Sequence, residues 1–320
     1  AMSVATDHSI PHPPLELLFT VDEETGLTGA GKLKSDWLAG KILMNIDSEN
    51  DEVFTVGCAG GLDTEIRLPF QRKNPPAKRL EFYELKVRGL KGGHSGVDIH
   101  EQRGNAVKIL SRLLLVLLEK HGARIVSING GTAHNAIPRE ASALLAFMPE
   151  NVRAARQKVS EFEKIAAEEY RKAEPNLKAS LEKIDREITA STVPICETDG
   201  LKTVRLLRSI PHGVYGMSLD VPGLVETSNN LATVKTNANT VEIVTSQRTS
   251  IMSRLDEITE NIKSAAKLAG AECKDKNGYP AWKPDMDSPL LSKCVGIYEK
   301  LHGKKPKIEV IHAGLECARS

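Results

Sequence analysis

The 320-residue sequence has no apolar run long enough to cross a membrane. Its longest purely aliphatic stretch, LLLVLL at residues 113–118, is far shorter than the roughly 18 residues that a membrane-spanning helix needs. The sequence also lacks an N-terminal basic segment followed by an apolar one, the pattern of a secretory signal. These absences predict a cytoplasmic protein that does not bind membranes.

The sequence has almost no net charge and no C-x-x-C motif. Its 43 Lys and Arg residues and 42 Asp and Glu residues give a net charge of +1. Composition therefore provides no electrostatic attraction to nucleic acid. The five cysteines are odd in number, which predicts free thiols in a reducing compartment.

The length and composition are those of a globular protein with about two domains. Residues 13–21 (PPLELLFTV) and 41–47 (KILMNID) are short, apolar and followed by acids. They predict two buried, neighbouring strands of a parallel sheet, with an active crevice at the carboxyl ends of the strands. Residues 52–68 predict antiparallel structure around a turn at GCAGG.

The middle of the chain has a different pattern. Residues 103–122 predict a helix that ends at Gly122 and is apolar almost all round. Such a helix is buried on two sides, either within its own domain or against a partner subunit.

The order strand, strand, helix, strand is expected twice, which predicts an α+β domain made of two similar halves. The two sets are residues 123–130, 139–147, 150–172 and 177–184, and residues 224–236, 239–249, 250–269 and 271–276. Proline-containing segments at residues 71–79 and 277–289 are the predicted domain boundaries. The fold class is thus an α/β domain interrupted by an inserted α+β domain.

Three consecutive acids, Asp22, Glu23 and Glu24, follow the first apolar segment. Adjacent carboxylates repel each other, and a divalent cation relieves this repulsion by taking carboxylate oxygens as ligands. A carboxylate beside the ion can act as general base towards a metal-bound water. Asp47 follows the second apolar segment and is placed to supply another ligand. Spacing alone also fits a solvated acidic loop.

Six motifs occur in a characteristic order: FTVDEETGLTGA, NIDSE, GCAGG, GLKGGHSGVDIHEQRGNA, GGTAHNAIPREA and IHAGLEC. Together they resemble the dizinc peptidase and deacylase family, and within it the Xaa-His dipeptidases, through nearly the whole chain. The resemblance implies a metallopeptidase catalytic domain at residues 1–79 and 277–320, and a lid domain that commonly dimerises at residues 80–276. It also implies a dipeptide substrate, a homodimer and two Zn²⁺ or other divalent ions.

The resemblance assigns roles to the acids. In the family's Glu-Glu pair the first residue is the general base and the second is a zinc ligand, and these match Glu23 and Glu24. Asp47 matches a ligand of the other zinc ion.

The resemblance also assigns roles to three residues of the lid. His94 matches the histidine that in relatives reaches a neighbouring active site and stabilises the oxyanion. Asn135 matches a substrate contact, and Arg248 lies where relatives often hold the substrate carboxylate. From the residues alone, His94 also fits an exposed turn, Asn135 a turn that its own side chain stabilises, and Arg248 a surface ion pair.

Other polar residues near these motifs are expected to have supporting roles. We expect His134 to face solvent or to support a residue of the site, and His312 and Glu316 to line a pocket without binding metal. Cys58 and Cys317 are expected to be small buried apolar residues.

The sequence departs from the family pattern in three places. It has no upstream His-x-Asp motif, no bridging Asp in an ADNG-like stretch and no final His after HAGLE. We therefore expect a fragment of the enzyme that lacks both ends of the catalytic domain, does not retain zinc and is inactive by itself.

The function predicted from the residues and the resemblance is hydrolysis of Xaa-His-type dipeptides through a zinc-activated water. One alternative is a related amidohydrolase, such as an acyl-amino-acid deacylase. Another is a non-catalytic dimerisation or binding module that has lost its metal site.

Overall fold

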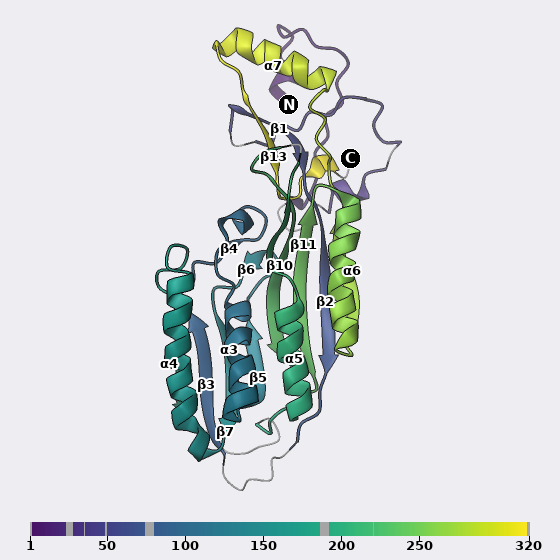
Figure 1. Cartoon of the computed structure of the whole chain (residues 1–320). Coiled ribbons are helices and arrows are strands. Elements are labelled where there is room, and N and C mark those ends of the chain that lie inside the picture. The colour runs from purple at the N-terminus through teal and green to yellow at the C-terminus, as the bar shows by residue number, and fades with distance from the viewer. Residues whose placement is uncertain are drawn as a thin grey trace.

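The computed structural model describes residues 2–23, 28–34, 36–48, 50–73, 80–185, 192–219 and 221–318. Figure 1 shows a large sheet with helices along it, and a smaller part at one end that carries both termini. The helices are α1 (Met2–Thr6), α3 (Ala106–His121), α4 (Val152–Glu169), α5 (Glu197–Ser209), α6 (Met252–Leu268) and α7 (Pro289–His302). Short 3-10 turns are η1 (Ala30–Lys32), η2 (Ile99–Glu101), η3 (Pro149–Asn151) and η4 (Glu316–Ala318).

Within these described ranges the large sheet has nine strands. Their order is β12-β2-β11-β10-β5-β7-β3-β8, and β9 is paired to β10. All of its pairings are antiparallel. Its strands are β2 (Gly60–Pro69), β3 (Glu81–Arg88), β5 (Arg124–Gly130), β7 (Ala141–Phe147), β8 (Lys178–Ile184), β9 (Gly213–Met217), β10 (Val225–Thr236), β11 (Thr240–Thr249) and β12 (Glu272–Tyr279). Two small sheets pair β1 (Val53–Cys58) with β13 (Lys307–Ile311), and β4 (Gly93–His94) with β6 (Ala136–Ile137).

The predicted pair of similar halves is confirmed, and each half is larger than the sequence pattern indicated. Unit 1 consists of β3, α3, β5, β7, α4 and β8, and unit 2 of β2, α5, β10, β11, α6 and β12. In both units the first strand lies between the third and the fourth, and the second strand is at one edge. These edges join where β5 pairs with β10. Unit 1 is therefore inserted into unit 2 between β2 and α5.

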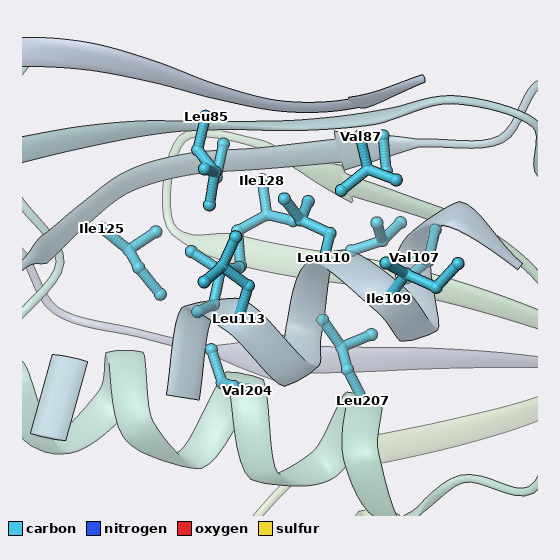
Figure 2. Packing of buried hydrophobic residues seen from close by; sticks show 14 of the residues in the cluster. Leu85, Val87, Val107, Ile109, Leu110, Leu113, Ile125, Ile128, Val204 and Leu207 are labelled. Atoms are coloured by element: carbon cyan, nitrogen blue, oxygen red, sulfur yellow. The ribbon is translucent and has the colours of Figure 1, made fainter. Parts of the chain in front are cut away.

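The two units share one hydrophobic core. Apolar side chains of α3, α4, α5 and α6 pack with those of the sheet in a single cluster. Figure 2 shows Leu110 and Leu113 of α3 between the sheet and Val204 and Leu207 of α5. Each such side chain contributes about 1.5–3 kcal/mol when it is fully buried.

Helix α3 is apolar almost all round because its own chain covers it. Asn105 caps its first turn by accepting from the backbone amides of Val107 and Lys108, and Gly122 ends it with a φ of 63°. It packs against α4, α5 and several strands. The first of the two environments expected for this helix, burial within its own domain, is therefore the observed one.

The first two predicted strands are wrong as local structure. Residues 13–21 and 41–47 are assigned to no strand, and most of their apolar side chains are exposed, including Phe19 at 69% and Ile42 at 66%. A strand forms only where a neighbour accepts its backbone hydrogen bonds, and the described part of the chain pairs neither segment in a sheet. The parallel pair of this region is instead β1 with β13, covered by α7 through the Phe54–Tyr298 ring contact.

The predicted turn at GCAGG is also wrong. Strand β1 ends at Cys58 and β2 begins at Gly60, but β1 pairs with β13 whereas β2 pairs with β11 and β12. The chain therefore passes directly from the small parallel sheet into the large one. The domain division at residues 79 and 277 stays a prediction, and residues 74–79 lie outside the described residues.

Candidate functional site

The GGHSG and HNAIP motifs are brought together by a two-stranded sheet. His94 of β4 pairs with Ala136 of β6, and the backbone amide of Ser95 donates to the carbonyl oxygen of Asn135 at 2.8 Å. Two of the residues predicted from the sequence, His94 and Asn135, are thus fixed side by side although 41 positions separate them.

The backbone fixes which nitrogen of His94 carries a proton. Its Nδ1 accepts hydrogen bonds from the amides of Gly96 at 3.2 Å and Val97 at 3.1 Å. A backbone amide can only donate, so Nδ1 is the acceptor and the proton of the neutral ring is on Nε2. His94 therefore presents an N–H donor, the group that stabilises a developing oxyanion.

The surroundings of His94 keep it neutral. Partial burial lowers its pKa, and the positive charge of Arg248 lowers it further. Asp98, which accepts from the backbone amide of His94 at 2.8 Å, opposes this shift only in part. At neutral pH the ring is therefore an uncharged hydrogen-bond donor.

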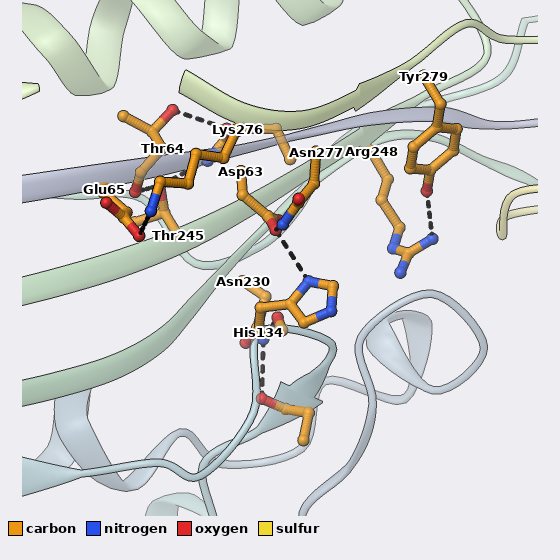
Figure 3. Close-up of polar contacts among 12 residues, drawn as sticks. Asp63, Thr64, Glu65, His134, Asn230, Thr245, Arg248, Lys276, Asn277 and Tyr279 are labelled. Atoms are coloured by element: carbon orange, nitrogen blue, oxygen red, sulfur yellow. Dashed lines mark hydrogen bonds and ion pairs between the residues drawn. The ribbon is translucent and has the colours of Figure 1, made fainter. Parts of the chain in front are cut away.

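Arg248 lies on β11 and is 8% exposed. Its Nη1 donates to the hydroxyl oxygen of Tyr279 at 2.7 Å, as Figure 3 shows. Its Nε is buried without a hydrogen-bond partner among the described residues. A buried guanidinium that has unused donors is suited to bind a carboxylate. The surface ion pair considered from the sequence is not the environment of Arg248.

Tyr279 is held by close packing on both sides. A Cβ atom at Gly61 would lie 2.6 Å from the Tyr279 hydroxyl oxygen, and one at Gly314 would lie 2.7 Å from its ring. Only glycine leaves room for the ring at these two positions. The Arg248 partner is thus fixed between β2 and the segment that follows β13.

A buried carboxylate binds His134, the residue before Asn135. Asp63 of β2 accepts from His134 Nδ1 at 2.9 Å and from Asn277 Nδ2 at 2.7 Å (Figure 3). Burial acts to raise the pKa of Asp63, but these hydrogen bonds outweigh it, so the pKa is lowered. The hydrogen bond to Asp63 raises the pKa of His134. The expectation that His134 supports a residue of the site agrees with this geometry.

His312 connects β10 with the C-terminal segment. Its Nε2 and the hydroxyl of Ser228 are 2.8 Å apart, and the ring is 8% exposed. Burial lowers its pKa to about 3, so the ring is neutral. A neutral, deeply buried imidazole that pairs with serine is consistent with a structural residue.

A cavity of about 530 Å³ opens beside His94 and Asn135. Lys91, Arg139 and Glu140 also line it. This volume is within the range of sites for small molecules.

The predicted acidic residues are not assembled into a site by the described residues. Glu23 is half-buried, Glu24 lies outside the described residues, and Asp47 is exposed, with its backbone amide bonded to the side chain of Asn45. No three His, Cys, Asp or Glu residues of the described ranges are grouped closely enough to hold a metal ion. The described residues therefore do not by themselves fit a zinc centre.

Comparisons with known proteins agree with this arrangement. Residues 85–174, most of unit 1, match the family model described as a peptidase dimerisation domain. The chain is 39% identical over 317 residues to the cytosol non-specific dipeptidase of Escherichia coli (strain K12). The aligned region covers 99% of this chain and 64% of that protein. This chain is therefore similar in sequence, over nearly its whole length, to a dipeptidase. The resemblance to dipeptidases noted from the motifs is thereby confirmed.

The fold of the chain is also that of a solved relative. The crystal structure of aminoacylhistidine dipeptidase from Vibrio alginolyticus matches with a TM-score of 0.91 and 37% identity, over 99% of this chain and 64% of that one. The chain thus spans 64% of the length of each relative.

Sequence reasoning missed the residues that position the predicted ones, namely Tyr279, Asp63, Asn277 and Asn230. No local motif marks them, because each acts through a partner far away in the chain. A polar residue at a buried strand position is the only signal, and Asp63 and Asn230 provide it.

No helix among the described residues is long and apolar enough to span a membrane.

Proposed function

We propose that the protein is a metal-dependent dipeptidase that hydrolyses Xaa-His-type dipeptides. The observation that carries this proposal is the His94 ring, whose Nδ1 is occupied by two backbone amides so that Nε2–H is the available donor. The homology to dipeptidases supports the reaction class.

The lid residues have distinct roles in this proposal. Arg248 binds the substrate carboxylate and is oriented by Tyr279. Asn135 contacts the substrate from the wall of the cavity that it shares with His94. His94 donates from Nε2 to the carbonyl oxygen as negative charge develops there, which stabilises the transition state more than the bound substrate.

The acids have roles that the resemblance supports. Glu23 is proposed as the general base that accepts a proton from the attacking water, and Glu24 and Asp47 as one ligand each for two divalent ions, zinc in the family. Since the described residues do not form a metal-binding group, no step of the reaction is derived through the ions.

A homodimer and a cytoplasmic location belong to the same proposal. The match of unit 1 to a peptidase dimerisation domain supports the dimer, and the cytosolic relative supports the location. Sedimentation equilibrium at micromolar concentration tests the dimer. A monomer mass under these conditions would contradict it.

Substrate profiling tests the reaction. Xaa-His dipeptides, other dipeptides and acyl-amino acids are supplied in parallel to a preparation with measured metal content. Release of histidine from Xaa-His dipeptides is the expected result. Release of an acyl group alone would favour the deacylase, and turnover of none of them would favour a non-catalytic module.

A further inference from the structure

Asn230 binds the backbone on both sides of Asn135. Its Nδ2 donates to the carbonyl oxygen of His134 at 3.2 Å and to that of Ala136 at 2.8 Å. Asn230 lies on β10 of unit 2 and is 1% exposed, whereas the residues that it binds belong to unit 1. One side-chain amide therefore fixes the path of the chain through a predicted substrate contact.

The orientation of Asn230 is determined by these two bonds. Both acceptors are carbonyl oxygens, so the atom facing them is the NH₂ group. The same orientation leaves the buried Oδ1 of Asn230 without a hydrogen-bond partner among the described residues. The side-chain amide of Asn230 thus uses its NH₂ group to hold the backbone around Asn135, while its Oδ1 accepts no hydrogen bond from the described residues.

A second connection between the units holds the same segment. The His134 side chain bonds Asp63 of β2, and Asp63 is fixed in turn by Asn277. The side chain of His134 is 51% exposed, so this histidine is accessible to solvent. The side chain of Asp63, to which it binds, is 6% exposed and is therefore enclosed by the protein. The backbone of Asn135 is thereby fixed from β10, from β2 and, through Ser95, from the His94 turn.

We propose that Asn230 and the Asp63–His134 pair are positioning residues that set the place of Asn135 relative to His94. We call these three residues the inter-unit clamp. The inference rests on the proposed function, in which Asn135 contacts substrate. It assigns to unit 2 a role in orienting the substrate site of unit 1.

The clamp depends on pH through His134. The titratable and charged groups that face His134 are Asp63, Arg248 and the neutral His94. The hydrogen bond and charge of Asp63 raise the pKa of His134 and the charge of Arg248 lowers it, with a net rise. Between the lowered pKa of Asp63 and the raised pKa of His134 the pair carries opposite charges and is strongest. As the pH rises through the pKa of His134, the attraction is lost and the clamp weakens.

Amide hydrogen exchange tests the clamp without any need for catalysis. The probe is the Ser95 amide, which donates to the Asn135 carbonyl, and the Asp98 amide, which donates to the His94 carbonyl, is the reference. In the purified 320-residue chain, His134→Ala should speed exchange at Ser95 by roughly 2- to 10-fold relative to Asp98, as expected for one hydrogen bond. Asn230→Ala should do the same or more.

Two further variants separate the clamp from general damage. His134→Gln retains an amide donor towards Asp63 and should restore most of the Ser95 protection. His121→Ala is the matched control, because it also removes a histidine of unit 1. His121 is the last residue of α3 and does not belong to the clamp. Unchanged Ser95 exchange in both His134→Ala and Asn230→Ala would overturn the proposal.

The pH profile of kcat/KM gives the second readout, in a preparation that hydrolyses dipeptides. The unmodified protein and His121→Ala should lose kcat/KM on the alkaline side as His134 deprotonates, and His134→Gln should lack that limb. If His134→Gln shows the same alkaline loss of kcat/KM as the unmodified protein, the proposal is overturned, even if the variants change the exchange rate of the Ser95 amide. Absence of dipeptide hydrolysis in every preparation would count against the proposed function, and the exchange result would still decide the clamp.

Discussion

Arg248 and Tyr279 form a hydrogen bond of 2.7 Å that joins β11 to the end of β12. The bond occupies one donor of a buried guanidinium and fixes the direction of the others. The Tyr279 hydroxyl carries no formal charge, so this bond does not neutralise the positive charge of Arg248.

Replacing Tyr279 by Phe tests this relationship. The change retains the ring between Gly61 and Gly314 but removes the acceptor of Arg248. We expect KM for Xaa-His dipeptides to rise by roughly 2- to 10-fold, the value of one hydrogen bond, with a smaller change in kcat. Tyr215→Phe is the control, because Tyr215 also accepts one hydrogen bond, from Asn261, but is 45% exposed. Equal KM values in Tyr279→Phe and Tyr215→Phe would refute the hypothesis that the Tyr279 hydroxyl orients Arg248 for substrate binding.

Replacing His94 by Ala tests the oxyanion donor. The negative charge that Nε2–H stabilises exists only in the transition state, so kcat should fall much more than KM rises. A loss in kcat on the order of 10²-fold is expected for one such donor. Steady-state kinetics at matched metal content measures it. An unchanged kcat would leave His94 as a residue of the turn.

Zinc retention tests the predicted ligands. Catalytic zinc has about three protein ligands and a water. Glu24 and Asp47 give one predicted ligand to each ion, so the purified 320-residue chain should lose zinc during dialysis. After dialysis it should cleave Xaa-His dipeptides only when divalent metal ions are supplied again. Elemental analysis and a ninhydrin assay measure both. Stoichiometric zinc with turnover would show that other residues of this sequence complete the sites.

Replacing Leu113 by Ala tests the shared core. Leu113 is fully buried between the sheet and α5, and its truncation leaves a cavity. We expect a loss of about 2–5 kcal/mol in the free energy of unfolding. Leu268→Ala, at a position that is 91% exposed, should change it by less than about 0.5 kcal/mol. Urea denaturation of both variants gives the comparison, and similar midpoints would show that this core is not limiting.

The sequence pattern predicted most of the helices and sheet strands of residues 80–276, because the periodicity of apolar residues reports burial directly. The buried residues of α4 are 152, 155, 159, 162 and 166, which are apolar and recur at the spacing of one helix face. Helix α5 was missed, since its buried face includes Gly200 and Thr203, which have no apolar signature.

The strands at residues 13–21 and 41–47 were predicted from apolarity alone. Apolar composition shows that a segment tends to be covered, but not which neighbour pairs with its backbone. The same limit explains why the sequence did not predict the pairing of β2, whose partners β11 and β12 lie far along the chain. Local sequence predicted that β2 is extended, but it contains no information about the sheet that receives it.

The candidate site divides in the same way. The motifs identified His94, Asn135 and Arg248, because their resemblance to a family is local. The residues that orient them, Tyr279 and Asn230, became visible only when distant strands were placed together.

The insertion of unit 1 into unit 2 has a consequence for the order of folding. Thr64 of β2 bonds Gln247 of β11, a contact between residues 183 positions apart. Closing a loop of that length costs conformational entropy, and unit 1 shortens the effective loop once it has folded, because its own first and last strands, β3 and β8, are adjacent. During synthesis β2 leaves the ribosome long before β11, and it stays unpaired for the whole time in which unit 1 forms. An unpaired strand edge is prone to wrong pairing. Folding of unit 1 therefore shortens the time in which the edge of β2 is exposed before β11 and β12 pair with it.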